Sequence, residues 1–365
     1  MSNVDWLASL SPWPKEGFGL ERMRALLAGL GDPQLSYPSV HVVGTNGKST
    51  TTRTIEATLR SEGVDAAAYT SPHVRGWEER IRVGGHEVTS LERALQRVRP
   101  QAEALGATQF EVLTAAALAE FAEAGVEVAA VEAGLGGRHD ATNVLRSPVQ
   151  VLTNVSLEHT EVLGPTREAI AVEKLAVVQP GSTVVLGEPE WASLARANGA
   201  GRVVVQPGGT ASLAASAVEA FLGRPVEPVP VQLPGRLERR DGEIWDGAHT
   251  PDAVRFVGAQ LPRLGSIVAS VLADKDVDGI LSGLAPLAPA LVATTSSSPR
   301  ALPAGALAQR ARRFFTSVVE VPDPVRALRR GHELGEPVLV TGSLYLLADL
   351  SAALDRRPWR SAARA

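Results

Sequence analysis

Residues 39–50 read Ser-Val-His-Val-Val-Gly-Thr-Asn-Gly-Lys-Ser-Thr, and this stretch carries the strongest fold signal in the chain. The mostly apolar run 40–43 predicts a buried strand, and residues 49–61 predict the helix that follows it. Glycines between them let backbone N–H groups approach an anion, the helix N-terminus adds positive charge, and Lys48 can reach the phosphates. Valine occupies position 42, where the full consensus has glycine, and an ordinary turn is the alternative. We expect a nucleotide site made by Gly44, Thr45, Asn46, Gly47, Lys48, Ser49 and Thr50.

Outside this stretch, short apolar runs alternate with helical periodicity, which is typical of parallel sheets covered by helices. We expect strands over residues 65–69, 126–132, 149–154, 267–272, 290–295 and 337–341, helices over 91–105 and 111–124, and a polar surface loop over 71–87. Four prolines within residues 223–235 predict a linker between two domains. The expected fold is therefore α/β, with an N-terminal P-loop ATPase-like domain (residues 1–233, mostly parallel sheet) and a smaller C-terminal Rossmann-like α/β domain (residues 234–365).

The composition narrows the class of protein. The chain has 365 residues, 44% of them apolar and 21% charged, which is typical of globular proteins. Its net charge of −4 gives no basic surface for nucleic acid, and the absence of cysteine excludes disulfides and thiol catalysis. The N-terminus shows no signal-peptide pattern, and glutamates interrupt the apolar runs well short of a membrane span. We therefore expect a cytoplasmic protein with no nucleic acid or membrane partner.

A candidate metal site follows from the ends of two predicted strands. Residues 128–131 are apolar and end in Glu132, and the strand at 151–154 leads after four residues to His159. In open α/β sheets the ligand crevice lies at the carboxyl ends of the strands, so Glu132 is expected beside the phosphate loop. Mg²⁺ prefers such oxygen ligands, and the histidine nitrogen also allows Mn²⁺. A loop histidine without a metal is the alternative for His159.

Lysine is rare in this chain. Only four of the 36 basic residues are lysines, and Lys48 and Lys174 both stand in candidate chemical segments. Unlike arginine, lysine offers a compact point charge and an amine that can lose its proton. Lys174 lies on a helix expected to begin near Arg167, where a solvated surface lysine is the alternative.

Taken together, the motifs resemble the folate branch of the Mur ligase superfamily, the bacterial dihydrofolate synthase/folylpolyglutamate synthases. The longest matching run is Glu132–Asn143, which reads EAGLGGRHDATN. The other matching pieces, in chain order, are residues 19–22 (GLER), 44–48 (GTNGK), 70–73 (TSPH), 79–81 (ERI), 110–111 (FE), 159–160 (HT), 173–174 (EK), 234–236 (PGR), 246–249 (DGAH), 274–276 (DKD) and 341–343 (TGS).

The resemblance implies an ATP-dependent ligase that phosphorylates a carboxylate of dihydropteroate or a folate and lets the amino group of L-glutamate attack the acyl phosphate. It implies that Ser71, Glu132 and His159 coordinate Mg²⁺, and that Arg236 and Asp246 contact the nucleotide. Lys174 matches a lysine that is carbamylated in the family, a reaction that needs a neutral amine. The second domain would be the glutamate-ligase domain, and a monomer is expected.

The resemblance also implies where the substrates bind. The folate contacts are expected at Phe18, Gly19, Leu20, Phe110, Glu111, His139, Asp140 and Ala141. Arg138 is a candidate partner for a carboxylate or phosphate, because its planar fork binds such groups bidentately, with a structural ion pair as the alternative. His249 is a candidate catalytic residue on the glutamate or phosphate side.

Four positions depart from the family pattern: Ser49, Glu158, Ala214 and Thr250. Ser49 and Thr50 are closer to the peptidoglycan-building Mur enzymes, so a peptidoglycan-type Mur ligase is an alternative function. An ATP-binding paralogue without ligase activity is a second, and a phosphoryl-transfer kinase is a third. We expect the bifunctional folate enzyme, with ATP and Mg²⁺ as its cofactors.

Overall fold

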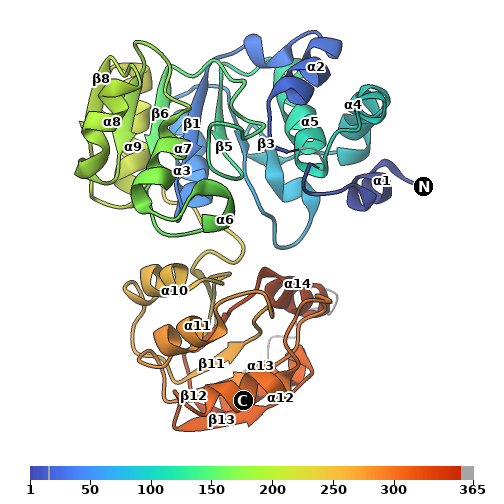
Figure 1. The fold of residues 1–365 in the computed structure, drawn as a ribbon, viewed down its shortest axis with the longest axis vertical. Coiled ribbons are helices and arrows are strands. Elements are labelled where there is room, and N and C mark those ends of the chain that lie inside the picture. Colours follow the sequence, from blue (N-terminus) through green and yellow to red (C-terminus); the bar gives the residue numbers. More distant parts are fainter. Residues whose placement is uncertain (15–16, 355–365) are drawn as a thin grey trace, which may run out of the picture. The chain divides into compact units, whose positions relative to one another are not determined.

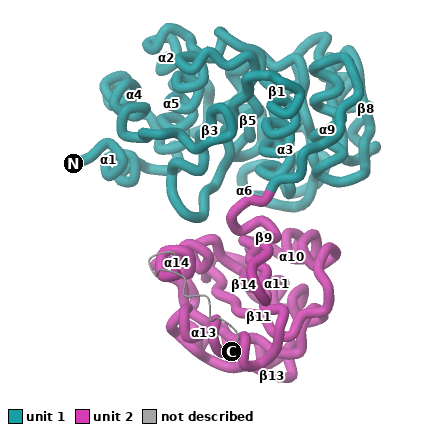
Figure 2. Tube along the Cα trace, turned by 180° about the vertical axis from the view of Figure 1, so that it is seen from behind, with its two compact units in different colours: residues 1–231 teal, residues 232–365 magenta. Residues whose placement is uncertain are grey.

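The chain divides into two compact units, Met1–Val231 and Gln232–Ala365 (Figure 2). The computed structural model describes residues 1–14 and 17–354. The division falls within the proline-containing stretch 223–235. The roles expected for the two units, nucleotide binding and glutamate ligation, stay predictions.

Unit 1 is built on an eight-stranded sheet with the order β4-β3-β2-β5-β1-β6-β7-β8. β1, the strand before the phosphate loop, lies in the interior of this sheet and is parallel to its two neighbours, β5 and β6. The strands are β1 (Ser39–Val43), β2 (Ala66–Tyr69), β3 (Ile81–Val83), β4 (His86–Glu87), β5 (Val128–Glu132), β6 (Val149–Leu152), β7 (Thr183–Leu186) and β8 (Arg202–Val205). Only β3 and β4, at one edge, pair antiparallel among the described strands of this sheet. The interior strands are buried on both sides, which explains their mostly apolar sequences.

Helices cover both faces of this sheet (Figure 1). Val128 and Ala130 of β5 pack in a core with α3 and α9, whereas Ala129 and Val131 pack on the other face with α5. This alternation is that of a strand buried on both sides. The helices are α1 (Asn3–Ser9), α2 (Glu21–Gly29), α3 (Lys48–Ser61), α4 (Leu91–Leu105), α5 (Gln109–Glu123), α6 (Thr160–Leu163), α7 (Arg167–Leu175), α8 (Ala192–Ala197) and α9 (Thr210–Leu222), with 3₁₀ turns η1 (Pro33–Leu35), η2 (Trp77–Arg80) and η3 (Pro189–Trp191).

Unit 2 is a second α/β layer structure, with a six-stranded sheet in the order β13-β12-β11-β14-β10-β9. Its strands are β9 (Glu238–Arg240), β10 (Glu243–Trp245), β11 (Ser266–Ala269), β12 (Ala290–Ala293), β13 (Ser317–Glu320) and β14 (Val338–Thr341), all parallel except β9. Its helices are α10 (Pro251–Gly258), α11 (Val277–Leu284), α12 (Ala304–Ala311), α13 (Pro324–Leu334) and α14 (Leu344–Leu354). The α/β class and the mostly parallel N-terminal sheet are as predicted.

The loop predicted over residues 71–87 is wrong in its second half, where η2, β3 and β4 form. Gly84 and Gly85 both have positive φ, 58° and 85°, and make the tight hairpin turn between β3 and β4. The short run Ile81-Arg82-Val83 then pairs with the open edge of β2. Within residues 1–14 and 17–354, no helix is long and apolar enough to cross a membrane.

Candidate nucleotide and metal site

The phosphate loop joins β1 to α3, as the sequence predicts for a strand–loop–helix unit. Gly44 and Gly47 have positive φ, 144° and 79°, and a Cβ atom at Gly44 would collide with the Thr153 side chain. Lys48 Nζ donates to the carbonyl oxygens of Gly44 and Thr45, at 3.0 and 3.1 Å. The ammonium group therefore lies over the loop, where it can exchange these carbonyls for phosphate oxygens.

Glu132, the last residue of β5, lies beside the phosphate loop. Its carboxylate is buried and accepts hydrogen bonds from Ser49 Oγ at 3.1 Å and from the Ser71 backbone N–H at 2.9 Å. The parallel register places Glu132 opposite Val42 of β1, two residues before the loop begins. The structure thus brings together Glu132, Ser71 and the first turn of α3, from three separate parts of the sequence.

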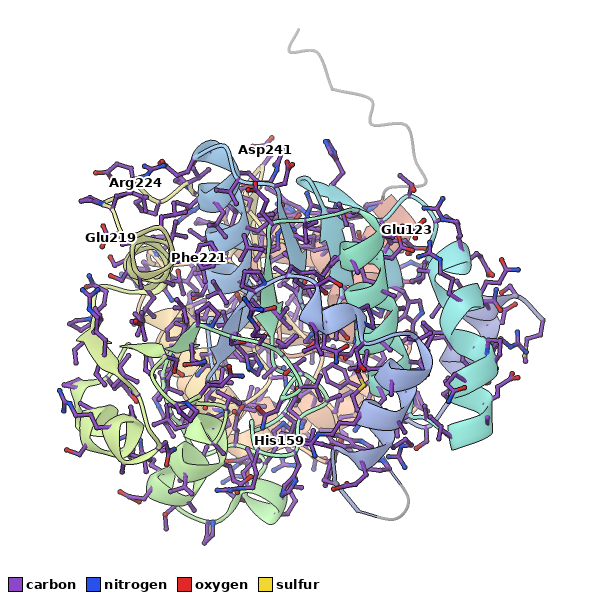
Figure 3. The ribbon with its side chains drawn as sticks, turned by 90° about the horizontal axis from the view of Figure 1, so that it is seen from above. Glu123, His159, Glu219, Phe221, Arg224 and Asp241 are labelled. Carbon is purple, nitrogen blue, oxygen red and sulfur yellow. The ribbon has the colours of Figure 1, made fainter. Side chains whose placement is uncertain are left out.

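His159 lies on the segment that precedes α6 and is labelled in Figure 3. It has φ of 46°, its side chain is 38% exposed, and its Nδ1 atom lies 3.8 Å from Glu161 Oε1. The same segment contacts the phosphate loop, because the Ser156 N–H donates to Thr45 Oγ1 at 3.0 Å. The segment that leads to His159 therefore contacts the loop, and the His159 side chain itself is partly exposed.

Lys174 is not a solvated surface lysine. Its side chain is only 1% exposed, and Nζ donates to Gly44 O at 2.8 Å and to Glu158 Oε1 at 2.7 Å. Burial lowers the pKa of Lys174 to about 8, with Glu158 opposing the shift and Lys48 adding to it. Burial raises the pKa of Glu158, but the ammonium groups of Lys48 and Lys174 outweigh it and leave this pKa below its usual value. Both lysines donate to one carbonyl oxygen, that of Gly44.

The donor set around Glu132 fits a hard divalent cation. A buried carboxylate with two serines beside a phosphate loop supplies oxygen ligands, which Mg²⁺ and Mn²⁺ accept. Among the described residues, no group of three or more histidine, aspartate or glutamate side chains could hold a metal. A metal here would therefore depend on serine, phosphate and water oxygens as well.

Arg80 lies near Glu132 and bonds His73, two residues that the sequence reasoning did not single out as a pair. Arg80 Nε donates to His73 Nδ1 at 3.0 Å, and the His73 ring packs edge-on against Trp77. Burial and then Arg80 lower the pKa of His73 to about 3, so this ring is neutral. Burial lowers the pKa of Arg80, and the nearby Tyr69 and Glu132 oppose that shift. The matching pieces at 70–73 and 79–81 were the available signal, but they gave no indication that these side chains meet.

Asp140, expected to contact substrate, has its carboxylate occupied by its own loop. Oδ2 accepts the Leu135 N–H at 2.7 Å, and Oδ1 accepts the Thr142 N–H and hydroxyl at 3.0 and 2.5 Å. Burial raises the pKa of Asp140, and these hydrogen bonds oppose that shift. Thr142 Oγ1 in turn lies 2.8 Å from Nε2 of the buried His41 on β1. Asp140 therefore fixes the shape of the loop after β5.

The neighbours of Asp140 differ in exposure. Arg138 Nε pairs with Glu173 Oε1 at 2.9 Å, which is the structural ion pair that was the alternative for this residue. Its backbone N–H also donates to Glu173 O, so the loop is attached to α7. His139 is exposed, whereas Ala141 lies in the core beneath α5.

His41 makes unit 1 sensitive to acid. Burial lowers the pKa of His41 to about 4, against 6.5 in the unfolded chain. Between these values the unfolded state binds more protons, so stability is lost as pH falls from 6.5 to 4, by about 3 kcal/mol. We expect His41→Gln to flatten this part of the pH dependence in urea unfolding, whereas the exposed control His86→Gln leaves it unchanged. Equal slopes for wild type and His41→Gln would contradict the assignment.

Among the expected folate contacts before residue 112, some side chains are exposed and others are engaged in contacts within the protein. Phe18 is 44% exposed and packs edge-on against Trp13, while Leu20 is buried beside Gly19 at the start of α2. Glu111 forms the capping box of α5 with Thr108 and an ion pair with Arg22 Nε at 2.8 Å. The Phe110 ring lies so close to Gly134 that a Cβ atom there would collide with it.

Three candidate residues lie in unit 2. The buried Asp246 accepts the backbone N–H groups of Leu237 and Ala248, at 2.8 and 2.9 Å. Burial raises the pKa of Asp246, and Arg236 is the main opposing influence. Arg236 Nη1 donates to Gly235 O at 3.1 Å. His249 Nδ1 lies 2.8 Å from Gly247 O, a distance at which that nitrogen donates a hydrogen bond to the carbonyl.

Comparison with known proteins identifies the family of this chain. A family model of the Mur ligase middle domain matches residues 42–202. The dihydrofolate synthase/folylpolyglutamate synthase of Mycobacterium tuberculosis is 33% identical, over 86% of this chain and 81% of that protein.

Solved structures agree over nearly the whole chain. The structure of E. coli FolC in complex with DHPP and ADP has a TM-score of 0.87 at 27% identity and covers 98% of both chains. The Yersinia pestis bifunctional folylpolyglutamate synthase/dihydrofolate synthase complexed with AMPPNP and Mn ion has a TM-score of 0.85 at 28% identity, covering 97% of this chain and 98% of that one. The predicted resemblance and Mur ligase architecture are confirmed. The chain belongs to the dihydrofolate synthase/folylpolyglutamate synthase family, a family of ATP-dependent ligases with a Mur ligase middle domain.

Proposed function

We propose that this protein uses ATP to join L-glutamate to the carboxylate of dihydropteroate, of reduced folates, or of both, and releases ADP and phosphate. The observation that carries the proposal is the contact between Glu132 and Ser49, directly after Lys48 of the phosphate loop. A buried acid next to a phosphate loop suits a metal-bound nucleotide, and the relatives of this chain carry the names of folate-glutamate ligases.

In this reaction the substrate carboxylate attacks the γ-phosphorus of ATP, and ADP leaves. The amino group of glutamate then attacks the acyl phosphate carbon, loses a proton, and expels phosphate as the amide forms. Lys48 and the loop N–H groups neutralise and orient the phosphates, which is where most of the catalytic effect of such enzymes arises. Ser71, Glu132 and His159 would hold Mg²⁺ or Mn²⁺, which would supply further positive charge at the phosphates.

We further propose that Lys174 is carbamylated in the active enzyme. Carbon dioxide reacts with a neutral amine, and a pKa of about 8 leaves a larger neutral fraction at physiological pH than an exposed lysine has. The reaction would release a proton and leave an anionic carbamate, which would repel the Glu158 carboxylate that Nζ now contacts. Nuclear magnetic resonance with ¹³C-labelled bicarbonate tests this: a carbamate signal is expected in the wild type and not in Lys174→Met.

The remaining roles extend the same proposal. Arg236 and Asp246 would contribute to the nucleotide site, and His249 would act on the glutamate or phosphate side. Arg138 would bind a substrate carboxylate or phosphate, but only after its ion pair with Glu173 breaks. The folate would contact the region of Phe18, Gly19, Leu20, Phe110, Glu111, His139, Asp140 and Ala141. We place the enzyme in the cytoplasm as a monomer, a state that a solution mass measurement checks.

The test is incubation with ATP, Mg²⁺ and glutamate, with dihydropteroate or a reduced folate in separate tubes, followed by product mass. We expect a gain of one or more glutamyl units in at least one tube, with ADP released. No gain in either tube from folded, ATP-binding protein would favour the inactive paralogue. ADP release that requires a UDP-muramoyl peptide would favour the peptidoglycan ligase, and a stable phosphorylated product would favour a kinase.

A further inference from the structure

The segment formed by residues 154–159, between β6 and α6, is bonded directly to the phosphate loop. The Thr45 N–H donates to Asn154 O at 3.0 Å, and the Asn46 N–H donates to Asn154 Oδ1 at 2.9 Å. Asn154 Nδ2 returns a bond to Asn46 O at 3.3 Å, and the Ser156 N–H donates to Thr45 Oγ1 at 3.0 Å. Two residues of the loop therefore take their position from this segment, which also carries Glu158 and His159.

An ion pair holds the segment from the opposite side. Glu188, two residues after β7 ends, accepts the Val155 N–H through Oε2 at 3.0 Å, and Arg167 Nε donates to Val155 O at 2.9 Å. The two side chains also pair with each other, Arg167 Nη2 to Glu188 Oε1 at 3.1 Å. Both polar backbone groups of one residue, Val155, are thus bound by these two side chains, which we call the Glu188–Arg167 clamp. Arg167 Nη2 also pairs with Glu190 Oε1 at 2.7 Å.

Other contacts keep the clamp in one geometry. Trp191 Nε1 donates to Glu188 Oε2 at 2.7 Å, and the guanidinium of Arg167 lies over the Trp191 ring, 5.4 Å from its centroid. Gly187 packs against the Thr153 carbonyl so closely that any Cβ atom there would collide with it. Because the two segments approach this closely, Glu188 lies next to Val155, at the start of the 154–159 segment.

We propose that Glu188 and Arg167 are positioning residues of the nucleotide site. By holding Val155 they set the place of Asn154 and Ser156, and through them the backbone of Thr45 and Asn46. The inference rests on the proposed function, because it takes the loop to be the ATP site. The two side chains are 27% and 41% exposed, and ion pairs this exposed contribute little to stability. The clamp therefore affects nucleotide affinity more than unfolding.

The test compares Glu188→Gln and Arg167→Gln with a matched control, Glu103→Gln. Glu103 pairs with Arg99 on α4 at 2.8 Å and is 49% exposed, against 27% for Glu188, and among the described residues its bonds do not reach the loop or the 154–159 segment. With Mg²⁺ present, each clamp variant is expected to bind ATP and ADP about 10-fold more weakly, which is typical when a group that orients a binding residue is lost. The KM for ATP should rise by the same factor while the KM for glutamate stays within about twofold, and the control should bind like the wild type.

A second readout separates positioning from a general loss of structure. Amide hydrogen exchange in the peptide that contains residues 44–47 should be faster in both clamp variants and unchanged in Glu103→Gln. Because the two variants remove opposite halves of the pair, failure of one to fold leaves the other as the test.

Lys48→Ala distinguishes failure of this inference from failure of the proposed function. If Lys48→Ala loses ATP binding while both clamp variants bind at the wild-type level with unchanged exchange, the clamp has no positioning role. If Lys48→Ala itself binds ATP like the wild type, the loop is not the nucleotide site, and the proposed function and the inference fail together.

Discussion

Replacing Lys174 with methionine is expected to lower turnover about 100- to 1000-fold, the usual cost of removing one preorganised charged group from an active site. Methionine keeps the apolar stem in the buried position and removes the amine that bonds Gly44 O and Glu158. The single variant should also be less stable by about 3 kcal/mol, because Glu158 is left without its buried partner. Steady-state kinetics and urea unfolding measure the two effects.

The double variant Lys174→Met/Glu158→Gln is the matched control for this stability loss. It removes the unpaired carboxylate, so its unfolding free energy should return to within about 1 kcal/mol of the wild type. Turnover should stay as low as in the single variant. A double variant with wild-type turnover would show that the Lys174 amine is dispensable, whether or not it is carbamylated.

Lys48→Met is expected to reduce kcat/KM for ATP about 1000-fold. The ammonium group lies on the loop carbonyls of Gly44 and Thr45, and its loss removes the positive charge that the phosphates would meet. Stability should change by only about 1 kcal/mol, the contribution of ordinary hydrogen bonds. Lys48→Arg keeps the charge but replaces a compact ammonium with a planar fork, so we expect partial activity. If Lys48→Met retains wild-type ATP affinity, the phosphate loop has been misassigned.

The sequence predicted the phosphate-loop edge of the sheet because local signals there agree with one another. Three local signals agree here. The mostly apolar sequences of β1 and β5 indicate buried strands, and the glycines at 44 and 47 indicate a loop with positive φ. The carboxylate is the last residue of its strand. Once the strands are parallel neighbours, Glu132 must lie at the same edge as the loop. The parallel register alone therefore brings these residues together.

The parts that sequence reasoning missed depend on contacts between distant segments. Arg80 and His73 meet through a turn and an edge hairpin that looked like a polar loop. Glu188 reaches Val155 only because Gly187 permits a close approach between two chain segments, which no local pattern reports.

The substrate-contact predictions illustrate a different limit. Glu111 and Asp140 match family motifs, but the structure engages both carboxylates in nearby hydrogen bonds, in a helix cap and in a loop. A motif identifies which residues belong to a region without separating those that meet a ligand from those that shape the backbone around it. Their roles toward the folate stay predictions.

The central claim is that Glu132 and the phosphate loop form one nucleotide–metal site, and a diffraction experiment tests it most directly. Crystals grown with Mn²⁺ and a non-hydrolysable ATP analogue give an anomalous signal that locates the metal. We predict a peak at coordination distance from the Glu132 carboxylate and from the phosphates held at Lys48, and its loss in Glu132→Gln. Bound nucleotide at the loop with Mn²⁺ away from Glu132, or an undiminished peak in Glu132→Gln, would contradict this account.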